Sequence, residues 1–363
     1  MPNERARPTK SWVHKKRGKQ ARLSTRSVGP ADVSNTLCDE GFVRTNESQI
    51  RLTAVVVTYN RLDQLRKTVA ALLNTSREEL AHLLVINNAS DDGTAHWLTQ
   101  QNDPRLHVIQ MPENIGGAGG FAEGVRQARK LFDPDWLVLM DDDGRPSTDA
   151  IPKFHTEDLA GWDAIASAVY YPTGEICEMN RPSRNPFQHT KEFLRTLRLG
   201  RSGFHILPEV YAGKEIVPID VTSFVGFFIS RKGLDIAGEP DPSLFIYGDD
   251  GLYTLGLTQK GGKIGFCPTV QFEHDCSTFD GQRGAFRPIW KAYFYHRNLL
   301  LLYRLAAGWK FWLIAPLIIA KWLSKIKDHK NQKRNYLKLI SRAVIHGLTH
   351  NTKPKLADVK AWL

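Results

Sequence analysis

The fold of this chain is indicated first by residues 51–61, which read RLTAVVVTYNR. Within them, 52–58 form a continuous apolar run rich in β-branched residues, typical of a strand buried on both faces of a parallel sheet. Residues 61–74 follow with leucine and valine at helical spacing, so a helix is expected directly after the strand. The polar residues TYNR, at 58–61, are therefore expected at the carboxyl end of that strand.

The same alternation continues through the first half of the chain. Strands are expected at 83–87, 106–111 and 136–140, and helices at 94–101 and 120–132. Alternating strands and helices predict a doubly wound α/β sheet. Ligands of such sheets bind at the carboxyl ends of the strands. The polar segments of this chain lie at those ends, at 58–61, 87–92, 114–120 and 141–143.

The second half has a less regular pattern. Strands are expected at 164–171 and 263–271, helices at 251–261 and 286–307, and a basic loop at 180–203. Residues 218–230 are expected to form a strand pair or a buried segment. We divide the chain into a basic, partly flexible arm at 1–50, a catalytic domain at 51–300 and a helical C-terminal region at 301–363.

The composition of the 363-residue chain is that of a globular protein with basic ends. Hydrophobic residues make up 42%, which is enough to build a core and excludes a globally disordered chain. The net charge of +11 favours anionic partners such as phosphates, nucleic acid or an acidic membrane surface. The excess of lysine and arginine lies mainly in residues 1–29 and 310–360, so a nucleic-acid-binding surface is not expected on the central region.

Cysteine usage and hydropathy bear on where the protein resides. The cysteines are widely spaced, at Cys38, Cys177, Cys267 and Cys276. Without a CxxC pair, neither a zinc site nor a disulfide framework is expected, and a reducing cytosol fits this pattern. Residues 1–30 lack the apolar stretch of a signal peptide. Arg304 and Lys310 interrupt the apolar segment 299–320, so no membrane span is expected there.

Three adjacent carboxylates, Asp141, Asp142 and Asp143, directly follow the buried strand WLVLM. Like charges at this spacing repel one another, and a divalent cation held by oxygen ligands would relieve the repulsion. Asp141 and Asp143 can point in the same direction from an extended chain end, because they are two residues apart. The alternative is a solvated acidic turn closed by Gly144 and Pro146. The position at the ligand edge of the sheet favours the cation site.

Two further segments offer groups that bind nucleotides. NIGGAGG, at 114–120, leads into a predicted helix, whose first backbone amides are suited to phosphate. It is neither a P-loop nor a dinucleotide fingerprint, since no Gly-Lys-Ser/Thr follows and it comes after the third strand. The alternative is a mobile surface loop. NNASDDGT, at 87–94, can read a nucleobase or ribose, or it is simply a turn with a helix N-cap.

The second half adds two acidic segments. FIYGDD, at 245–250, places two carboxylates beside aromatic residues, and one of them is a candidate general base for a substrate hydroxyl. An acidic turn or a helix N-terminus explains the same residues equally well. FEHD, at 272–275, contains His274, which can complete a metal shell begun by Asp141 and Asp143 or serve a structural role.

These motifs together resemble a known family. TYNR, NNASDDGT, NIGGAGG and MDDDG, in this order on alternating strands, resemble the GT-A fold glycosyltransferases of family 2 over about residues 52–300. FIYGDD, EHD and the aromatic segment YFYHRN at 293–298 look most like bacterial galactofuranosyltransferases and their rhamnosyltransferase relatives. The fold implied is α/β, GT-A (Rossmann-like), with a mixed, mainly parallel sheet flanked by helices and a helical C-terminal region.

The resemblance also implies roles for individual residues. The nucleotide-sugar donor is expected to be contacted by Thr58, Tyr59, Asn60, Arg61, Asn88, Asp91, Gly116, Gly117 and Asp142. The family usually has Asp where Asn88 stands. A Mn²⁺ or Mg²⁺ ion would be held against the diphosphate by Asp141, Asp143 and His274. Asp250 matches the catalytic base, and Asp249 beside it would bind acceptor or donor sugar.

The reaction implied is an inverting transfer of galactofuranose from UDP-galactofuranose to a cell-surface glycan or a polyprenyl-linked acceptor. A rhamnosyltransferase that uses dTDP-rhamnose is the alternative within the family. A nucleotidyltransferase is the alternative enzyme class. Such an enzyme is expected to have a glycine-rich loop in the first strand–helix turn, whereas the TYNR turn contains no glycine. The non-enzyme alternative is a basic nucleic-acid-binding or membrane-binding protein.

Two helical segments are each open to two interpretations. The helix at 286–307 carries aromatics and arginine that suit sugar stacking or, equally, core packing. KFWLIAPLIIAKWLSKIK, at 310–327, is typical of an interfacial helix at an anionic membrane, with a dimer-packing helix of a homo-oligomer as the alternative. We therefore expect a cytoplasmic protein in peripheral contact with the inner face of the cell membrane, and no nucleic-acid partner.

Overall fold

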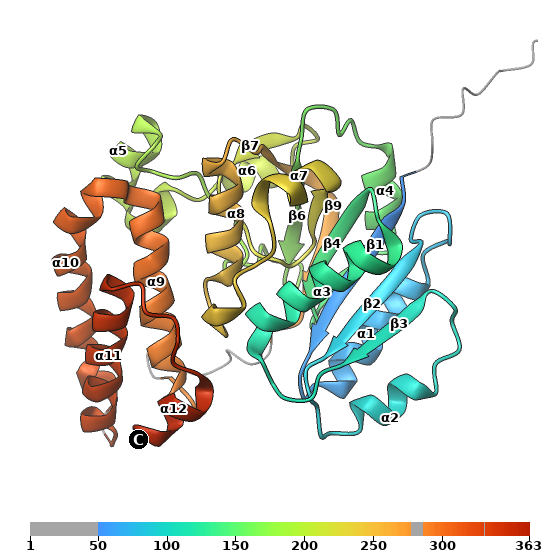
Figure 1. The fold of residues 1–363 in the computed structure, drawn as a ribbon. Helices are drawn as coiled ribbons and strands as arrows, with labels where there is room; N and C mark the ends of the chain where they lie inside the picture. Colours follow the sequence, from blue (N-terminus) through green and yellow to red (C-terminus); the bar gives the residue numbers. More distant parts are fainter. Residues whose placement is uncertain (1–49, 277–285, 330) are drawn as a thin grey trace, which may run out of the picture. The chain divides into compact units, whose positions relative to one another are not determined.

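The computed structural model describes residues 50–276, 286–329 and 331–363. The predicted basic arm lies outside these residues, apart from Ile50. Within the described chain, nine strands form one sheet, flanked by helices (Figure 1). Its strands are β1 (Leu52–Thr58), β2 (His82–Asn87), β3 (Leu106–Gln110), β4 (Trp136–Asp141), β5 (Gly144–Pro146), β6 (Ala164–Tyr170), β7 (Val217–Ile219), β8 (Phe227–Ser230) and β9 (Ile264–His274).

The sheet is mixed, with a parallel half built by the first half of the chain. The strand order is β3-β2-β1-β4-β8-β6-β9-β5, and β7 pairs with β9 beside this path. Strands β1 to β4 are parallel, β8 is antiparallel to both of its neighbours, and β6 runs parallel to β9. The predicted GT-A-like α/β fold, mainly parallel in its first half, is therefore confirmed.

Helices cover both faces because successive residues of a strand point to opposite sides of the sheet. In β1, Val56 packs in a core that includes Leu65 of α1, whereas Val55 packs in a second core that includes Phe121 of α3. The helices are α1 (Leu62–Leu73), α2 (Thr94–Thr99), α3 (Gly116–Phe132), α4 (Ala150–Thr156), α5 (Thr190–Leu199), α6 (Pro208–Tyr211), α7 (Arg231–Ala237), α8 (Asp249–Gln259), α9 (Lys291–Ala307), α10 (Phe311–Ser324), α11 (Lys333–Leu348) and α12 (Leu356–Ala361). Both faces of β1 are thus buried, as its unbroken apolar run predicts.

Strand register brings distant polar residues to one edge. Thr58 pairs with Asn87, and Val57 pairs with Asp141, so β1, β2 and β4 end together. The short strand β5 then turns back along β9, and its Gly144 pairs with His274. This antiparallel pairing places a histidine from late in the chain beside the acids that end β4.

The C-terminal helices α9 to α12 form a separate hydrophobic cluster around Tyr293, Phe294 and Tyr336. Segment Lys291–Asp328 is long and apolar enough to cross a membrane by length and composition alone, and an 18-residue stretch within it has a mean hydropathy of 1.3. No span was expected there, because Arg304 and Lys310 interrupt the apolar segment. It is divided at Gly308–Lys310 into α9 and α10, which lie side by side (Figure 1).

Two local expectations were wrong. The glycine-rich segment was expected to be a loop before a helix at 120–132, but α3 already begins at Gly116. The segment 180–203 was expected to be a loop, but it contains α5, which has no fully buried residue and carries exposed leucines at 194 and 197. Its leucines at 194, 197 and 199 are between 54% and 70% exposed, so this helix does not contribute to the hydrophobic core.

Candidate active site

The acids that follow β4 occupy different environments. Asp142 and Asp143 are both 3% exposed, whereas Asp141 is half-buried. Burial raises the pKa of Asp142 to about 7, against the opposing charge of Arg61. Burial and the nearby Asp143 raise the pKa of Asp141 to about 6. A concentration of carboxylates this deep in the fold requires positive charge beside it.

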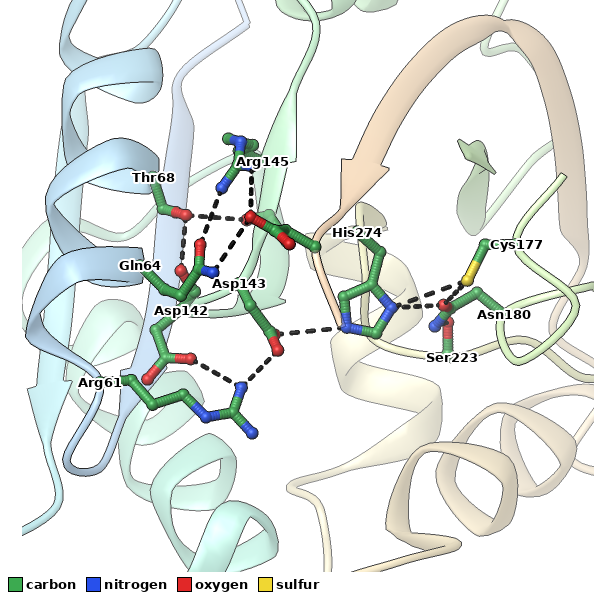
Figure 2. Close-up of polar contacts among 12 residues, drawn as sticks. Arg61, Gln64, Thr68, Asp142, Asp143, Arg145, Cys177, Asn180, Ser223 and His274 are labelled. Atoms are coloured by element: carbon green, nitrogen blue, oxygen red, sulfur yellow. Dashed lines mark hydrogen bonds and ion pairs between the residues drawn. The ribbon is translucent and has the colours of Figure 1, made fainter. Parts of the chain in front are cut away.

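Part of that charge comes from the TYNR segment. The Arg61 guanidinium pairs with Asp142 Oδ1 at 3.2 Å and with the carboxylate of Asp143, and Figure 2 shows it between the two. Thr58 donates a hydrogen bond to Asp142 Oδ2 at 2.7 Å. Two of the four residues expected at the donor, Thr58 and Arg61, thus contact the acids in this structure. Tyr59 and Asn60 are exposed beyond the strand end.

His274 approaches Asp143 from the other side of the acids. Its Nε2 lies 3.3 Å from Asp143 Oδ1, and its Nδ1 lies 2.7 Å from Asn180 Oδ1 (Figure 2). Burial opposes the charged forms of both partners. The hydrogen bond between them nevertheless raises the pKa of His274 to about 12, and with Arg61 it lowers the pKa of Asp143. In this state Asp143 is ionised and paired.

The two acids of FIYGDD begin helix α8. Asp250 is half-buried, and its Oδ1 accepts a hydrogen bond from the Gly251 amide at 2.6 Å. Burial raises the pKa of Asp250 to about 6. The charge of Asp250 contributes to the raised pKa of Asp141, so the two carboxylates are close enough to interact electrostatically. Asp249 is 9% exposed, and burial together with Asp250 raises its pKa well above the usual range.

A cleft of about 470 Å³ opens beside the acids, at the carboxyl end of β1. It is lined by Asn60, Arg61, Leu62, Asp63, Gln64, Asp92, Asp143 and Asp275. A larger hollow of about 720 Å³ lies along the outer face of α8, between that helix, α9 and residues 350–352. Asp249 lines the larger hollow and Asp143 the smaller one. The smaller cleft is the one next to the predicted donor residues.

The predicted contacts after β2 differ in their accessibility. Asn88 is 1% exposed, and its amide is used by backbone: Oδ1 accepts from the Ile115 amide at 3.0 Å and Nδ2 donates to the Gly116 carbonyl at 2.9 Å. Asn88 thus fixes the glycine-rich turn. Asp91 is exposed at the rim, and its backbone amide donates to Asn60 Oδ1 at 2.8 Å.

The glycine-rich turn itself packs against the segment that carries the acids of α8. Gly116 has φ +76°, and a Cβ added there would lie 2.1 Å from the Phe245 carbonyl oxygen. The Ala118 amide donates to the same carbonyl at 3.1 Å. By contrast, a Cβ added at Gly117 would meet nothing within 4 Å. Gly116 therefore positions residues 245–250 through the Phe245 carbonyl, a role that its sequence motif did not indicate.

Comparison with known proteins agrees with this architecture. The model of the family "Glycosyl transferase family 2" matches residues 53–213. The galactofuranosyltransferase GlfT1 of Mycobacterium tuberculosis (strain ATCC 25618 / H37Rv) is 30% identical over 243 residues, which cover 65% of this chain and 72% of that protein. The chain belongs to glycosyltransferase family 2. The GlfT1 of Mycolicibacterium smegmatis is 29% identical to this glycosyltransferase over 249 residues, or 65% of this chain and 73% of that protein.

A solved structure of low sequence identity has a related fold. GalNAc-T7, crystallised with UDP, GalNAc and Mn²⁺, aligns with 70% of this glycosyltransferase and 48% of its own chain, with a TM-score of 0.50 and 16% identity. This likeness concerns the fold alone. Together with the family match, it agrees with the expected GT-A architecture, and the enzyme class expected from the motifs is confirmed.

Helix α9 supplies residues of this glycosyltransferase whose role sequence reasoning missed. Asn298, fully buried, donates from Nδ2 to the carbonyls of Leu244, Ile246 and Tyr247 at 2.8 to 2.9 Å. Arg297, also fully buried, donates to the Leu244 carbonyl at 2.9 Å. These side chains brace the backbone that leads into α8. The signal was present in YFYHRN, but aromatic content suggested sugar stacking or core packing.

The residues at the acids fit a divalent cation. Asp143 Oδ1 and His274 Nε2 are 3.3 Å apart, close to the roughly 3 Å between neighbouring ligands of one small cation. Carboxylate oxygen and imidazole nitrogen are ligands that suit Mn²⁺. Asp141, half-buried at the same edge, offers a second carboxylate as third ligand. Within the described residues, its oxygens and the ligand atoms of Asp143 and His274 do not all lie within 4.8 Å of one another.

Proposed function

We propose that this glycosyltransferase moves galactofuranose from UDP-galactofuranose to a glycan or polyprenyl-linked acceptor, with inversion and with a divalent cation. The observation that carries the proposal is that Asp250, at the start of α8, lies close enough to Asp141 for its charge to contribute to the raised pKa of that acid. Similarity to the two mycobacterial GlfT1 proteins, over more than two thirds of their length, supports the choice of donor.

Asp250 is suited to act as the general base. Its pKa of about 6 leaves it ionised at neutral pH and basic enough to accept a proton from an attacking hydroxyl. The Gly251 amide fixes one carboxylate oxygen, which leaves the other for the acceptor. The acceptor oxygen that loses its proton attacks the anomeric carbon from the face opposite the diphosphate, so one C–O bond forms as the other breaks and the configuration is inverted without a covalent intermediate. Asp249, whose pKa is raised by burial and by Asp250, would bind acceptor or donor sugar through its carboxyl group.

Asp141, Asp143 and His274 would hold the Mn²⁺ or Mg²⁺ ion. When bound, the ion supplies Lewis-acid stabilisation of the charge that develops on the diphosphate. Arg61 contacts Asp142 and Asp143, so it would shift toward the diphosphate when the acids gain another positive charge. Asn60 lines the smaller cleft, and Tyr59 and Asp91 are exposed near it in the sequence, so these groups would contact the nucleobase or ribose.

Peripheral contact with an anionic membrane at its cytoplasmic face is part of the proposal. Around α10, four large apolar side chains are between 55% and 73% exposed: Trp309, Trp312, Leu313 and Leu317. Lysines at 321 and 325 follow on the same helix and its end. Indole rings and aliphatic chains next to lysines favour the headgroup region of acidic lipids, where a polyprenyl-linked acceptor resides. Packing between two copies of the chain is the alternative use of this surface.

Donor turnover tests the proposal. Purified protein is offered UDP-galactofuranose, dTDP-rhamnose and UDP-glucose with an acceptor glycan, in Mn²⁺ or EDTA, and nucleotide release is measured. UDP release from UDP-galactofuranose alone, abolished by EDTA and restored by Mn²⁺, is the expected result. Release from dTDP-rhamnose alone would instead establish the rhamnosyltransferase alternative, and full activity in EDTA would contradict the role given to the cation.

A further inference from the structure

Behind the catalytic acids, His274 contacts a pair of cysteines that the proposed reaction does not use. Cys177 is fully buried and its Sγ lies 3.8 Å from His274 Nδ1, on the ring edge opposite Asp143. Cys276 is half-buried, two residues beyond His274. Sγ of both cysteines and a ring nitrogen of His274 all lie within 4.8 Å of one another. The sequence separation of nearly a hundred residues explains why cysteine spacing predicted no metal site.

The spacing matches the ligands of a tetrahedral zinc ion. With Zn–S bonds of about 2.3 Å and Zn–N bonds of about 2.0 Å, two sulfurs of one zinc site are separated by about 3.8 Å and a sulfur and a nitrogen by about 3.5 Å. The 3.8 Å between Cys177 Sγ and His274 Nδ1 is within 0.3 Å of that value. The Cys276 sulfur lies within 4.8 Å of both other ligand atoms, so it is at most roughly 1 Å beyond the separations that a zinc ion requires.

A fourth ligand is also in place. Asn180 is 6% exposed, and its Oδ1 accepts hydrogen bonds from the Cys177 thiol at 2.9 Å and from His274 Nδ1 at 2.7 Å. Asn180 Nδ2 donates to Ser223 Oγ at 2.7 Å, which fixes the amide with its oxygen toward the sulfur and the nitrogen (Figure 2). The Cys177 thiol and His274 Nδ1 thus both donate to Asn180 Oδ1, and a cation bound between these three atoms would replace both hydrogen bonds.

We propose that Cys177, Cys276 and His274 Nδ1 form a second cation site, for Zn²⁺ or another thiophilic ion, with Asn180 Oδ1 as the fourth ligand. Binding releases the two thiol protons and the Nδ1 proton to solvent, so that thiolates and a neutral imidazole hold the ion. The half-buried Cys276 provides the side from which the ion enters, because the other sulfur is fully buried.

Occupation of this site would inhibit glycosyl transfer. An imidazole that binds zinc through Nδ1 keeps its proton on Nε2 and directs it to Asp143 Oδ1. His274 can then no longer offer Nε2 to a cation at the catalytic acids. This consequence rests on the proposed function, whereas binding of the ion at the cysteines does not.

Metal titration of the full-length protein tests the site. Protein freed of metal with EDTA and kept reduced is titrated with Co²⁺, which gives a sulfur-to-cobalt charge-transfer band only where thiolates coordinate, and Zn²⁺ is then added in competition. We expect one equivalent to bind, with the band lost in Cys177→Ser and in Cys276→Ser and Zn²⁺ affinity lowered at least about a hundredfold in each. Cys267→Ser is the matched control, since this buried cysteine bonds Thr269 Oγ1 at 3.1 Å and is outside the group.

Inhibition is measured with the same variants. In the Mn²⁺-dependent assay, stoichiometric Zn²⁺ should inhibit the wild type and Cys267→Ser but leave Cys276→Ser active. No charge-transfer band in the folded wild-type protein, or a band that survives both cysteine substitutions, would overturn the site. A normal band with zinc-insensitive turnover would overturn the inhibition. A normal band with no transfer from any donor would leave the site standing and refute the proposed function.

Discussion

The glycine-rich turn allows a sharp prediction, because two neighbouring glycines in it have opposite surroundings. Gly116→Ala should impair both stability and turnover, whereas Gly117→Ala should leave stability close to wild type. At Gly116 the added methyl group meets the Phe245 carbonyl oxygen at 2.1 Å and the Phe245 ring at 2.6 Å. At Gly117 it meets nothing within 4 Å, and the backbone angle is ordinary.

The magnitude follows from two contributions. The left-handed backbone at φ +76° costs alanine about 1 to 2 kcal/mol relative to glycine. The contact adds to this, because the Phe245 carbonyl must move by more than about 1 Å to reach ordinary separation. We expect a total loss of about 2 to 4 kcal/mol in the free energy of unfolding. Phe245 precedes Asp250 by five residues, and a shift of about 1 Å at a catalytic group costs roughly a hundredfold in kcat.

The assay pairs urea unfolding with steady-state turnover of the donor. Gly116→Ala should show a lower midpoint of unfolding and a kcat reduced about a hundredfold, with a smaller change in KM for the donor. Gly117→Ala, inside the first turn of α3, should be equal to the wild type or slightly more stable. If the two variants behave alike in both assays, Gly116 does not position the acid-bearing segment.

Three further predictions concern other parts of the molecule. Asn298→Ala should cost about 2 to 4 kcal/mol in urea unfolding and lower kcat more than KM, because three backbone carbonyls ahead of the catalytic acids lose their donor; an unchanged kcat would contradict this. The hydrogen bonds and charge of Arg105 hold the pKa of Asp103 at about 2, so their stabilisation is complete above about pH 4 and is lost as the pH falls toward 2. Asp103→Asn should therefore cost about 1 kcal/mol at pH 7, a value reduced for solvent exposure, and the difference from the wild type should shrink between pH 4 and 3; a constant difference would argue against the ion pair. The double substitution Leu313→Glu and Leu317→Glu should lower co-sedimentation with vesicles of anionic lipid at least about tenfold without reducing turnover of a soluble acceptor; unchanged sedimentation would favour packing between copies.

The parallel half of the sheet was predictable because each of its strands carries its own local signal. The run at 52–58 is rich in β-branched residues and apolar apart from its two threonines, and the structure has β1 at the same residues, all of them buried. Helix α5 was not predicted. It has no buried residue, and its leucines at 194 and 197 are exposed rather than packed in the core. Local periodicity reports burial, and it is ambiguous where an apolar face is exposed.

The site was less predictable, because its geometry depends on contacts between segments far apart in the chain. The acids and His274 were identified by residue type, but the pairing of β5 with β9 that joins them leaves no mark in either segment. Arg61 and Asn88 were expected at the donor. In this structure Arg61 donates a hydrogen bond to Asp142, and Asn88 accepts one from the Ile115 amide. Polar side chains alone do not reveal whether their partner is a ligand or the protein's own backbone.

The most direct test of the proposed mechanism is Asp250→Asn, assayed with UDP-galactofuranose, Mn²⁺ and acceptor, beside calorimetric titration with UDP. Asp235→Asn is the control, because this acid is exposed on α7 and pairs with Arg129 away from the cleft. We predict that Asp250→Asn lowers turnover by about a thousandfold or more and binds UDP within about twofold of the wild type, while Asp235→Asn changes neither. Turnover by Asp250→Asn at the level of the control would contradict the assignment of Asp250 as the base.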